Sequence, residues 1–150
     1  MAVKPVPDGY HTVTPSLSVR GAAGLIEFMQ QAFDAEVQDC LMRPDGAVGH
    51  ATLKIGDSIV MLGEVMGEWP PMPASLYLYV DDVDATYRRA LKAGAASVME
   101  PADMFWGDRH GGVRDAWGNV WLLATHVEDV PGPEINRRAE AFFAQQRPAG

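Results

Sequence analysis

The chain has 150 residues, of which 47% are hydrophobic and 21% charged, a composition typical of a folded globular protein and not of a disordered one. Twelve Lys and Arg against twenty Asp and Glu give a formal net charge of −8, so we expect neither nucleic acid nor an anionic membrane as a partner. No stretch is apolar for long enough to form a membrane span or a secretory signal, so we expect a cytoplasmic protein.

The first half of the chain is predicted to form a strand, a helix and three strands. After an N-terminal tail over residues 1–10, we expect a strand ending at Val19, a helix over 22–33, and strands over 36–42, 48–55 and 58–63. The helical segment has one apolar face, because its apolar residues recur at helical spacing. Asp-Gly and Gly-Asp pairs are typical turn residues between the strands. Residues 11–64 therefore form a predicted βαβββ module.

The second half repeats this order after a proline-rich linker over residues 65–73. Within residues 74–126 we expect a strand over 74–81, a helix over 84–93, and strands over 96–100, 109–114 and 119–125. The repeat spacing is about 60 residues, which predicts two tandem modules. The extension over 127–150 contains a predicted helix over 134–146 with an apolar side. That side packs either on its own domain or on a partner subunit.

Alternating side chains predict one apolar and one polar or aromatic face in each module. Val13, Leu17 and Val19 share the apolar side of the first strand, while Tyr77 and Tyr79 lie on the polar side of the fifth. A sheet that faces solvent is one explanation of this alternation. We favour the other, an α+β protein whose two βαβββ modules form a curved mixed sheet around a cleft, with a C-terminal helix.

The sequence resembles the vicinal oxygen chelate superfamily, which has the glyoxalase and bleomycin resistance fold, and most of all its PhnB-like subgroup. The resemblance covers about residues 11–126 and rests on the segments TPSLSV with EFMQQAFDAEV, GHATLKIGDSIVML, YLYVDDVDATYRRALKAGA and FWGDRHGGVRDAWGNVWLLATH. It implies two βαβββ modules that together form one domain. It also implies a homodimer, and leaves open whether the cleft lies within one chain or across a swapped dimer.

Metalloenzymes of this superfamily hold a divalent metal with ligands on the first and last strands of each module. The resemblance places those positions at Thr14, Ser75, Leu122 and either Val60 or Met61, none of which is a His or a carboxylate. A catalytic divalent metal needs about three nitrogen, sulfur or carboxylate ligands. We therefore expect no metal and no other cofactor; a divalent metal is possible but disfavoured.

Polar and aromatic side chains on the predicted strands, linker and loops are the candidate ligand-binding residues, because aromatic rings stack on flat ligands and Arg pairs with anionic groups. They are Thr14, His50, Thr52, Trp69, Ser75, Tyr77, Tyr79, Phe105, Trp106, Arg109 and Leu122. Structural roles compete with this reading: Trp106 could plug the cleft end, Arg109 could pair with neighbours, and Trp69 could pack on the surface or at a dimer contact. Cys40, the single cysteine, is expected to be a small core residue.

Two functions remain open from the sequence. The first is a metal-free, glyoxalase- or bleomycin-resistance-like homodimer that binds a small aromatic or amphipathic molecule. The acidic surface favours a ligand that is a cation. The alternative is an enzyme of the same superfamily, a lyase, isomerase or oxygenase, in which His50 or Glu64 acts as a general base or an unusual metal is used. Whether the chain is an enzyme at all is not decided by the sequence.

Overall fold

The computed structural model describes residues 2–146, so Met1 of the predicted tail and residues 147–150 of the predicted extension lie outside the described residues. The elements of the first half are β1 (Ser16–Val19), α1 (Ala22–Phe33), β2 (Glu36–Met42), β3 (Val48–Ile55) and β4 (Ser58–Glu64). Those of the second half are β5 (Ser75–Tyr79), α2 (Val83–Lys92), β6 (Ala96–Asp103), β7 (Asp108–Arg114) and β8 (Val120–His126), followed by α3 (Gly132–Gln145).

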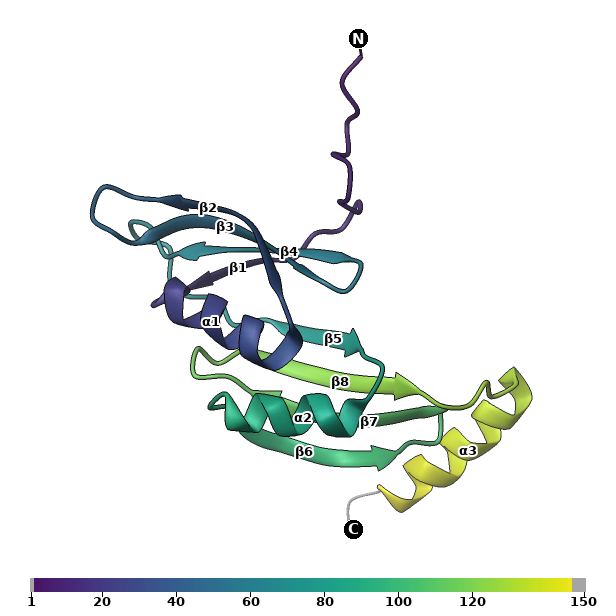
Figure 1. Ribbon diagram of the computed structural model, residues 1–150. Coiled ribbons are helices and arrows are strands. Elements are labelled where there is room, and N and C mark those ends of the chain that lie inside the picture. The colour runs from purple at the N-terminus through teal and green to yellow at the C-terminus, as the bar shows by residue number, and fades with distance from the viewer. Residues whose placement is uncertain (1, 147–150) are drawn as a thin grey trace.

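The strands form two four-stranded mixed sheets, sheet 1 in the order β1-β4-β3-β2 and sheet 2 in the order β5-β8-β7-β6 (Figure 1). In each sheet the first strand runs parallel to the last, and the other pairs are antiparallel. Ser16 pairs with Met61 as Tyr77 pairs with Leu122, so each partner in sheet 2 stands 61 residues after its counterpart. The predicted α+β fold with two βαβββ modules is confirmed.

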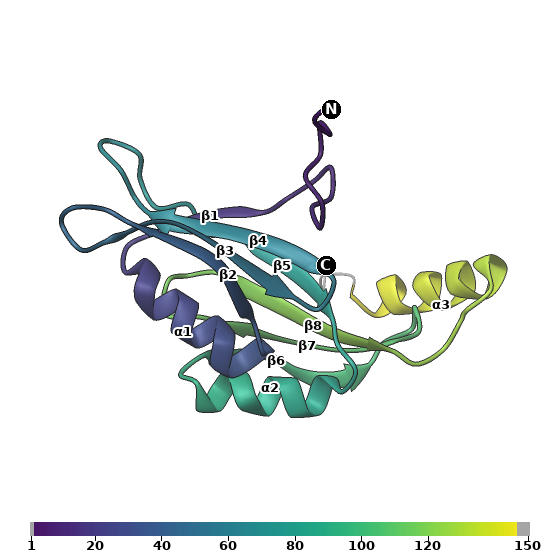
Figure 2. The same ribbon diagram turned by 45° about the horizontal axis from the view of Figure 1, so that its top comes forward.

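Helices α1 and α2 lie under the same face of the two sheets and contact each other (Figure 2). The buried apolar residues of both modules join in one core, in which Phe33 of α1 packs 4.8 Å from the ring centre of Trp121 on β8. Trp121 is completely buried. The modules are therefore held together by one hydrophobic interior, and their opposite faces carry the polar side chains.

The turn before β8 is built around the buried carboxylate of Asp115. One oxygen accepts the backbone N–H groups of Trp117 and Asn119, both at 2.9 Å, and the other accepts Asn119 Nδ2 at 2.9 Å and Trp121 Nε1 at 2.8 Å. The side-chain oxygen of Asn119 in turn accepts a hydrogen bond from the backbone N–H of Ala74, the residue before β5. Gly118 occupies the left-handed region with φ 87°, which glycine adopts without strain.

The two glycines at the start of α1 allow Trp117 to pack closely against this helix. A Cβ atom on Gly24 would lie 2.8 Å from Cζ2 of Trp117, so only glycine lets this indole approach the helix. Residue 21 has a φ of 88° and comes directly before the helix. The Gly21 to Gly24 segment is thus where the turn of module 2 docks on module 1.

Two expectations about burial are wrong. Val13 is 83% exposed because β1 begins only at Ser16, so strand alternation does not reach it. Cys40 is exposed, since every residue of β2, the edge strand of sheet 1, is exposed. Helix α3 buries none of its described residues within the chain, and its Phe142 and Phe143 contact Phe105; packing of its apolar side on a partner subunit stays a prediction.

Within residues 2–146, no helix combines the length and the apolar character needed to cross a membrane.

Candidate functional site

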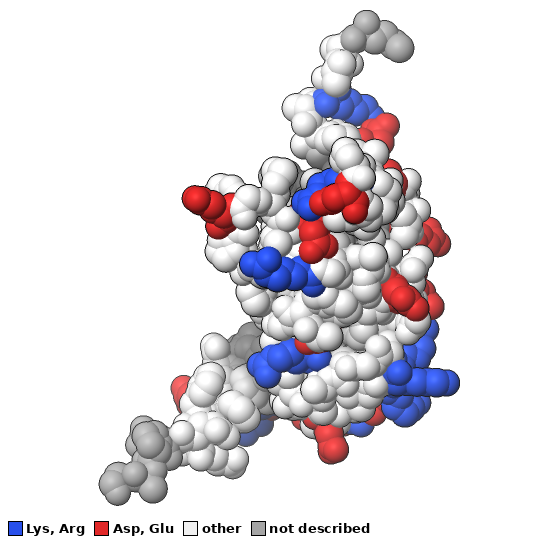
Figure 3. Space-filling model, turned by 90° about the vertical axis from the view of Figure 1, so that its left-hand side faces the viewer, with Lys and Arg blue, Asp and Glu red and all other residues white. Residues whose placement is uncertain are grey.

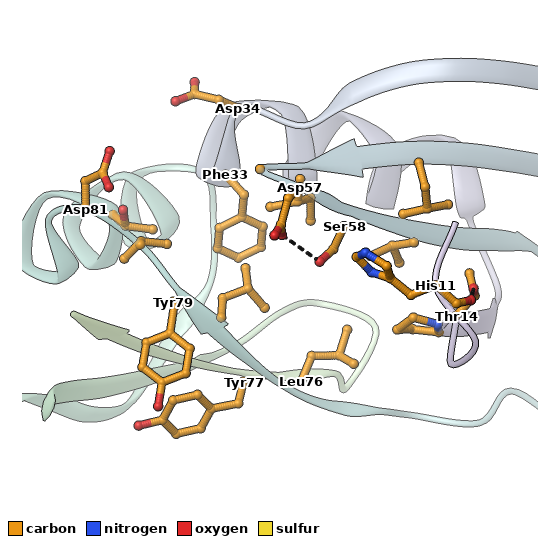
Figure 4. Close-up of a pocket in the computed structure, with 18 of the residues that line it drawn as sticks. His11, Thr14, Phe33, Asp34, Asp57, Ser58, Leu76, Tyr77, Tyr79 and Asp81 are labelled. Carbon is orange, nitrogen blue, oxygen red and sulfur yellow. Dashed lines mark hydrogen bonds between the residues drawn. The ribbon is translucent and has the colours of Figure 1, made fainter. Parts of the chain in front are cut away.

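A groove of about 930 Å³ runs between the two modules, along the edge of β5 (Figure 4). Its floor is apolar, with Phe33 at the end of α1, Val60 on β4 and Leu78 on β5. Its rim carries the carboxylates of Asp34, Asp57, Asp81 and Asp82 and one guanidinium, that of Arg89. The Arg89 guanidinium pairs with Asp34 at 2.7 Å, so the rim as a whole is acidic. An apolar floor with an acidic rim suits an amphipathic molecule with a positive charge.

Two tyrosines of β5 form one end of this groove, where Figure 4 shows their rings side by side. The ring centres of Tyr77 and Tyr79 lie 5.3 Å apart. Both hydroxyls donate to the same oxygen of Asp108, Oδ2, at 2.8 and 3.0 Å. Because both protons are used in this way, each hydroxyl oxygen can act as an acceptor toward solvent or a ligand.

Asp108 is the centre of a wider network on the polar face of sheet 2. It is only 2% exposed, and besides the tyrosines its Oδ2 accepts Trp106 Nε1 at 3.1 Å. His126 lies between two carboxylates, with Nδ1 2.9 Å from Oδ1 of Asp108 and Nε2 2.7 Å from Oδ1 of Asp129. These contacts hold the rings of Tyr77, Tyr79 and Trp106 in fixed positions around one buried charge.

The network shifts the pKa values of its members. Burial alone would raise the pKa of Asp108, but the hydrogen bonds from His126, Tyr77, Tyr79 and Trp106 outweigh it and lower that pKa. Burial, together with the bond to Asp108, raises the pKa of Tyr77 to about 12. The contact with Asp108, followed by that with Asp129, raises the pKa of His126. At neutral pH the tyrosines are thus uncharged, and Asp108 is a carboxylate.

His110 stands beside this network on β7. Its ring stacks on Tyr77 with a centre distance of 5.1 Å and an interplanar angle of 14°, and Trp106 lies 5.9 Å away on a tilted plane. Its Nδ1 lies 3.0 Å from the backbone oxygen of Leu123. The polar face of sheet 2 therefore carries a cluster of three neighbouring rings, those of Tyr77, Trp106 and His110, which we call the aromatic recess.

Several predicted ligand residues lie at the groove or the recess. Thr14, Tyr77 and Tyr79 line the groove, and Thr14 donates to the backbone oxygen of His11. Trp106 belongs to the recess, and Phe105 packs edge-on against it. Leu122 is half-buried beside Tyr77, with which it is paired in the sheet register, whereas Ser75 is exposed at the start of β5.

Other predicted residues lie elsewhere or are engaged by neighbours. Arg109 pairs with Asp84 at 2.7 Å and with Asp103 at 3.3 Å, and these contacts raise its pKa. Trp69 is 75% exposed in the linker and does not line the groove. On β3, His50 Nε2 lies 3.1 Å from the hydroxyl of Thr52, which is buried. The ligand contacts of these four residues stay predictions.

Glu64, the predicted general base, caps a helix. Its carboxylate accepts the backbone N–H groups of Gly21 at 2.9 and 3.0 Å and of Ala22 at 2.9 Å. These bonds, that to Ala22 first, lower the pKa of Glu64. The hydroxyl of Thr125, 61 residues later, accepts Val83 N–H at the start of α2 in the same way. In both modules the residue at this position binds the start of a helix. This structural role does not favour Glu64 as a general base.

The residues present do not fit a divalent metal at the positions that the superfamily uses. Thr14, Ser75, Leu122 and Met61 offer hydroxyl, aliphatic and thioether groups, which are poor ligands for a catalytic divalent ion. Among residues 2–146, no three His, Cys, Asp or Glu side chains gather as a possible metal site.

Sequence reasoning missed Asp108, His110 and His126 as parts of one site. The available signal was the paired register of β7 and β8, which sets Asp108 opposite His126 and His110 opposite Ala124. The register of β7 and β8 depends on the turn at Asp115, so it cannot be predicted from the sequence until the geometry of that turn is known.

The surface carries basic as well as acidic side chains despite the net negative charge. On the face in Figure 3, acidic and basic side chains are interspersed among uncharged atoms.

Comparison with known proteins gives both a family and a fold. The family model of the glyoxalase/bleomycin resistance protein/dioxygenase superfamily matches residues 10–123. An uncharacterized protein of Mycobacterium bovis is 38% identical over 137 residues, covering 82% of this chain and 88% of the relative. TioX from Micromonospora sp. ML1 aligns with a TM-score of 0.67 at 24% identity, over 78% of this chain and 99% of TioX. A PhnB protein from Bacillus cereus aligns with a TM-score of 0.62 at 22% identity, over 77% and 99%. These two structures show a common fold.

Proposed function

The chain belongs to the glyoxalase/bleomycin resistance protein/dioxygenase superfamily, and on this premise we propose that it binds a small aromatic or amphipathic molecule in the groove between its modules. The observation that carries the proposal is the groove itself, whose volume of about 930 Å³ and apolar floor match the sites that proteins use for small ligands. The tyrosine pair at its end offers flat faces for stacking.

The acidic rim narrows the ligand further. A positively charged aromatic molecule gains from the carboxylates of Asp57, Asp81 and Asp82 and from the faces of Tyr77 and Tyr79, since both attract cations. Such binding needs shape, stacking and charge and no metal. The proposal therefore agrees with hydroxyl and aliphatic side chains at the superfamily's metal positions.

The groove is tested with proflavine, a flat aromatic cation, followed by fluorescence anisotropy. Ser58 lines the groove and points into it, so Ser58→Trp should fill the space and abolish binding (Figure 4). Asp39→Trp places the same side chain on the exposed strand β2, outside the groove, and should leave binding unchanged. Equal binding by wild type and Ser58→Trp would refute the groove as the site.

Independence from metal is tested by a thermal-shift titration of metal-free protein with Ni, Zn, Mn, Fe and Co ions. A ligand that binds only the folded state raises Tm as its concentration rises. We expect no such rise, because the superfamily's positions hold Thr14, Ser75 and Leu122. Stabilisation that scales with the concentration of one ion would overturn this part of the proposal.

We further propose that the protein works as a homodimer in the cytoplasm. The superfamily resemblance and the exposed apolar side chains of Leu41, Met42 and Phe143 support the dimer. Light scattering should give twice the mass of the chain at micromolar concentration. The mass of a single chain would refute the dimer.

A further inference from the structure

One nitrogen of a buried histidine on sheet 2 has no partner among the described residues. His110 is 7% exposed, and within residues 2–146 its side chain makes one hydrogen bond, from Nδ1 to the backbone oxygen of Leu123 at 3.0 Å. Every fully buried side-chain nitrogen or oxygen of the described residues has a partner, so Nε2, which has none, is not completely buried. The remaining 93% of this residue's surface is covered by neighbours that include the rings of Tyr77 and Trp106.

The contact with Leu123 fixes which nitrogen carries the proton. A carbonyl oxygen accepts hydrogen bonds only, so Nδ1 must be the donor, and the neutral ring then leaves a lone pair on Nε2. The surrounding groups do not compete for that lone pair. The hydroxyl of Tyr77 and Nε1 of Trp106 both donate to Asp108, at 2.8 and 3.1 Å.

The aromatic recess thus presents flat ring faces around the free acceptor Nε2 of His110, beside the hydroxyl oxygen of Tyr77. The ring of Tyr77 stacks almost parallel to that of His110, and this contact fixes the orientation of the imidazole. Tyr77 also lines the groove, whereas His110 and Trp106 do not, so the aromatic recess adjoins the groove at the ring of Tyr77. An acceptor that loses its water when a ligand covers it, and receives no hydrogen bond in exchange, is penalised, and this favours ligands that carry a donor.

We infer that His110 is a specificity-determining residue that accepts a hydrogen bond from the ligand, so the ligand class is aromatic molecules bearing a hydroxyl or N–H donor on the ring. This inference rests on the proposed function, because the ring that stacks on Tyr77 is part of the same ligand. It adds to that function a preference for a proton donor.

The test compares 2-naphthol with 2-methoxynaphthalene, which has the same ring system but no donor. Binding is followed by the NMR resonance of the Trp106 indole N–H, and the ¹⁵N resonance of His110 Nε2 is recorded in parallel. One neutral hydrogen bond corresponds to about three- to tenfold in affinity. Wild type should therefore bind 2-naphthol about three- to tenfold more tightly, and the Nε2 resonance should move with 2-naphthol only.

His110→Phe should bind both probes equally, at the wild-type affinity for 2-methoxynaphthalene. Arg114→Phe puts the same side chain on an exposed position of the same strand and should keep the preference. Both variants are checked by circular dichroism, and the wild-type comparison stands even if His110→Phe does not fold.

The outcomes separate the two proposals. Equal wild-type affinity for the two probes, with an unmoved Nε2 resonance, would overturn the role of His110 and leave the proposed function standing. If neither probe binds up to its solubility limit, the aromatic recess is not a binding surface, and the inference falls together with aromatic binding.

Discussion

Replacing Asp115 by alanine should destabilise the fold far more than replacing a similar aspartate in module 1. Asp115→Ala removes the acceptor of four hydrogen bonds, three of which come from completely buried residues, Asn119 and Trp121. Each buried donor left without a partner costs about 1–3 kcal/mol, and local relaxation recovers part of the sum. We expect a loss of about 3–5 kcal/mol in the free energy of unfolding, a large fraction of the typical total of about 5–15 kcal/mol.

The matched control is Asp57→Ala in the corresponding turn before β4. Asp57 accepts one hydrogen bond within the described residues, from the exposed Ser58 hydroxyl at 3.1 Å, so this change should cost less than about 0.5 kcal/mol. Urea unfolding, followed by tryptophan fluorescence, gives both values. A difference of less than about 1 kcal/mol between the two variants would refute the reasoning that buried donors at this turn dominate its energy.

Three other predictions concern stability. The pKa of His126 is raised in the folded protein, so its contacts stabilise the fold fully when the pH is below the ordinary value of 6.5. Their contribution falls as pH rises through the raised pKa. This holds at pH values above the range in which the partner carboxylates become protonated. The advantage of wild type over His126→Gln in urea midpoint should therefore shrink with rising pH, and an advantage that grows would contradict this. Glu64→Gln should cost about 1 kcal/mol near neutral pH by weakening the cap of α1. Because the pKa of Glu64 is lowered, this cost should vanish as pH falls through that pKa in urea titrations, and a constant cost would argue against a charged cap. Gly24→Ala should lose about 1–2 kcal/mol by displacing Trp117, despite the better helix propensity of alanine, and a higher Tm in thermal unfolding would show that the indole adjusts freely.

Periodicity and turn residues were enough to predict most of the fold. The predicted ranges 22–33, 36–42 and 48–55 coincide with α1, β2 and β3, because each has strong local signals at both ends. The exposure of Cys40 could not be predicted, since an edge strand and a central strand of a sheet have similar local patterns. Its burial depends on which strands are neighbours, and that is set by long-range pairing.

The candidate site was predicted less well, for the same physical reason. Alternation alone placed Tyr77 and Tyr79 on the polar face, where they lie. Their shared acceptor, Asp108, is 29 and 31 residues away in sequence and comes from the far side of β8. Glu64 was a base candidate because sequence shows a carboxylate but not the two N–H donors of Gly21 and Ala22 that occupy it.

The contact between Phe33 and Trp121 has a consequence for how the molecule opens. Because Phe33 of α1 in the first module packs on Trp121 of β8 in the second, and both belong to one hydrophobic core, unfolding of either module exposes core residues of the other. Unfolding should accordingly be a single cooperative event, and the slowest-exchanging amides of β3 and β8 should share one opening free energy in native-state hydrogen exchange. A chain cut in the linker would leave two halves, each with an uncovered aromatic surface, that regain protection only when mixed.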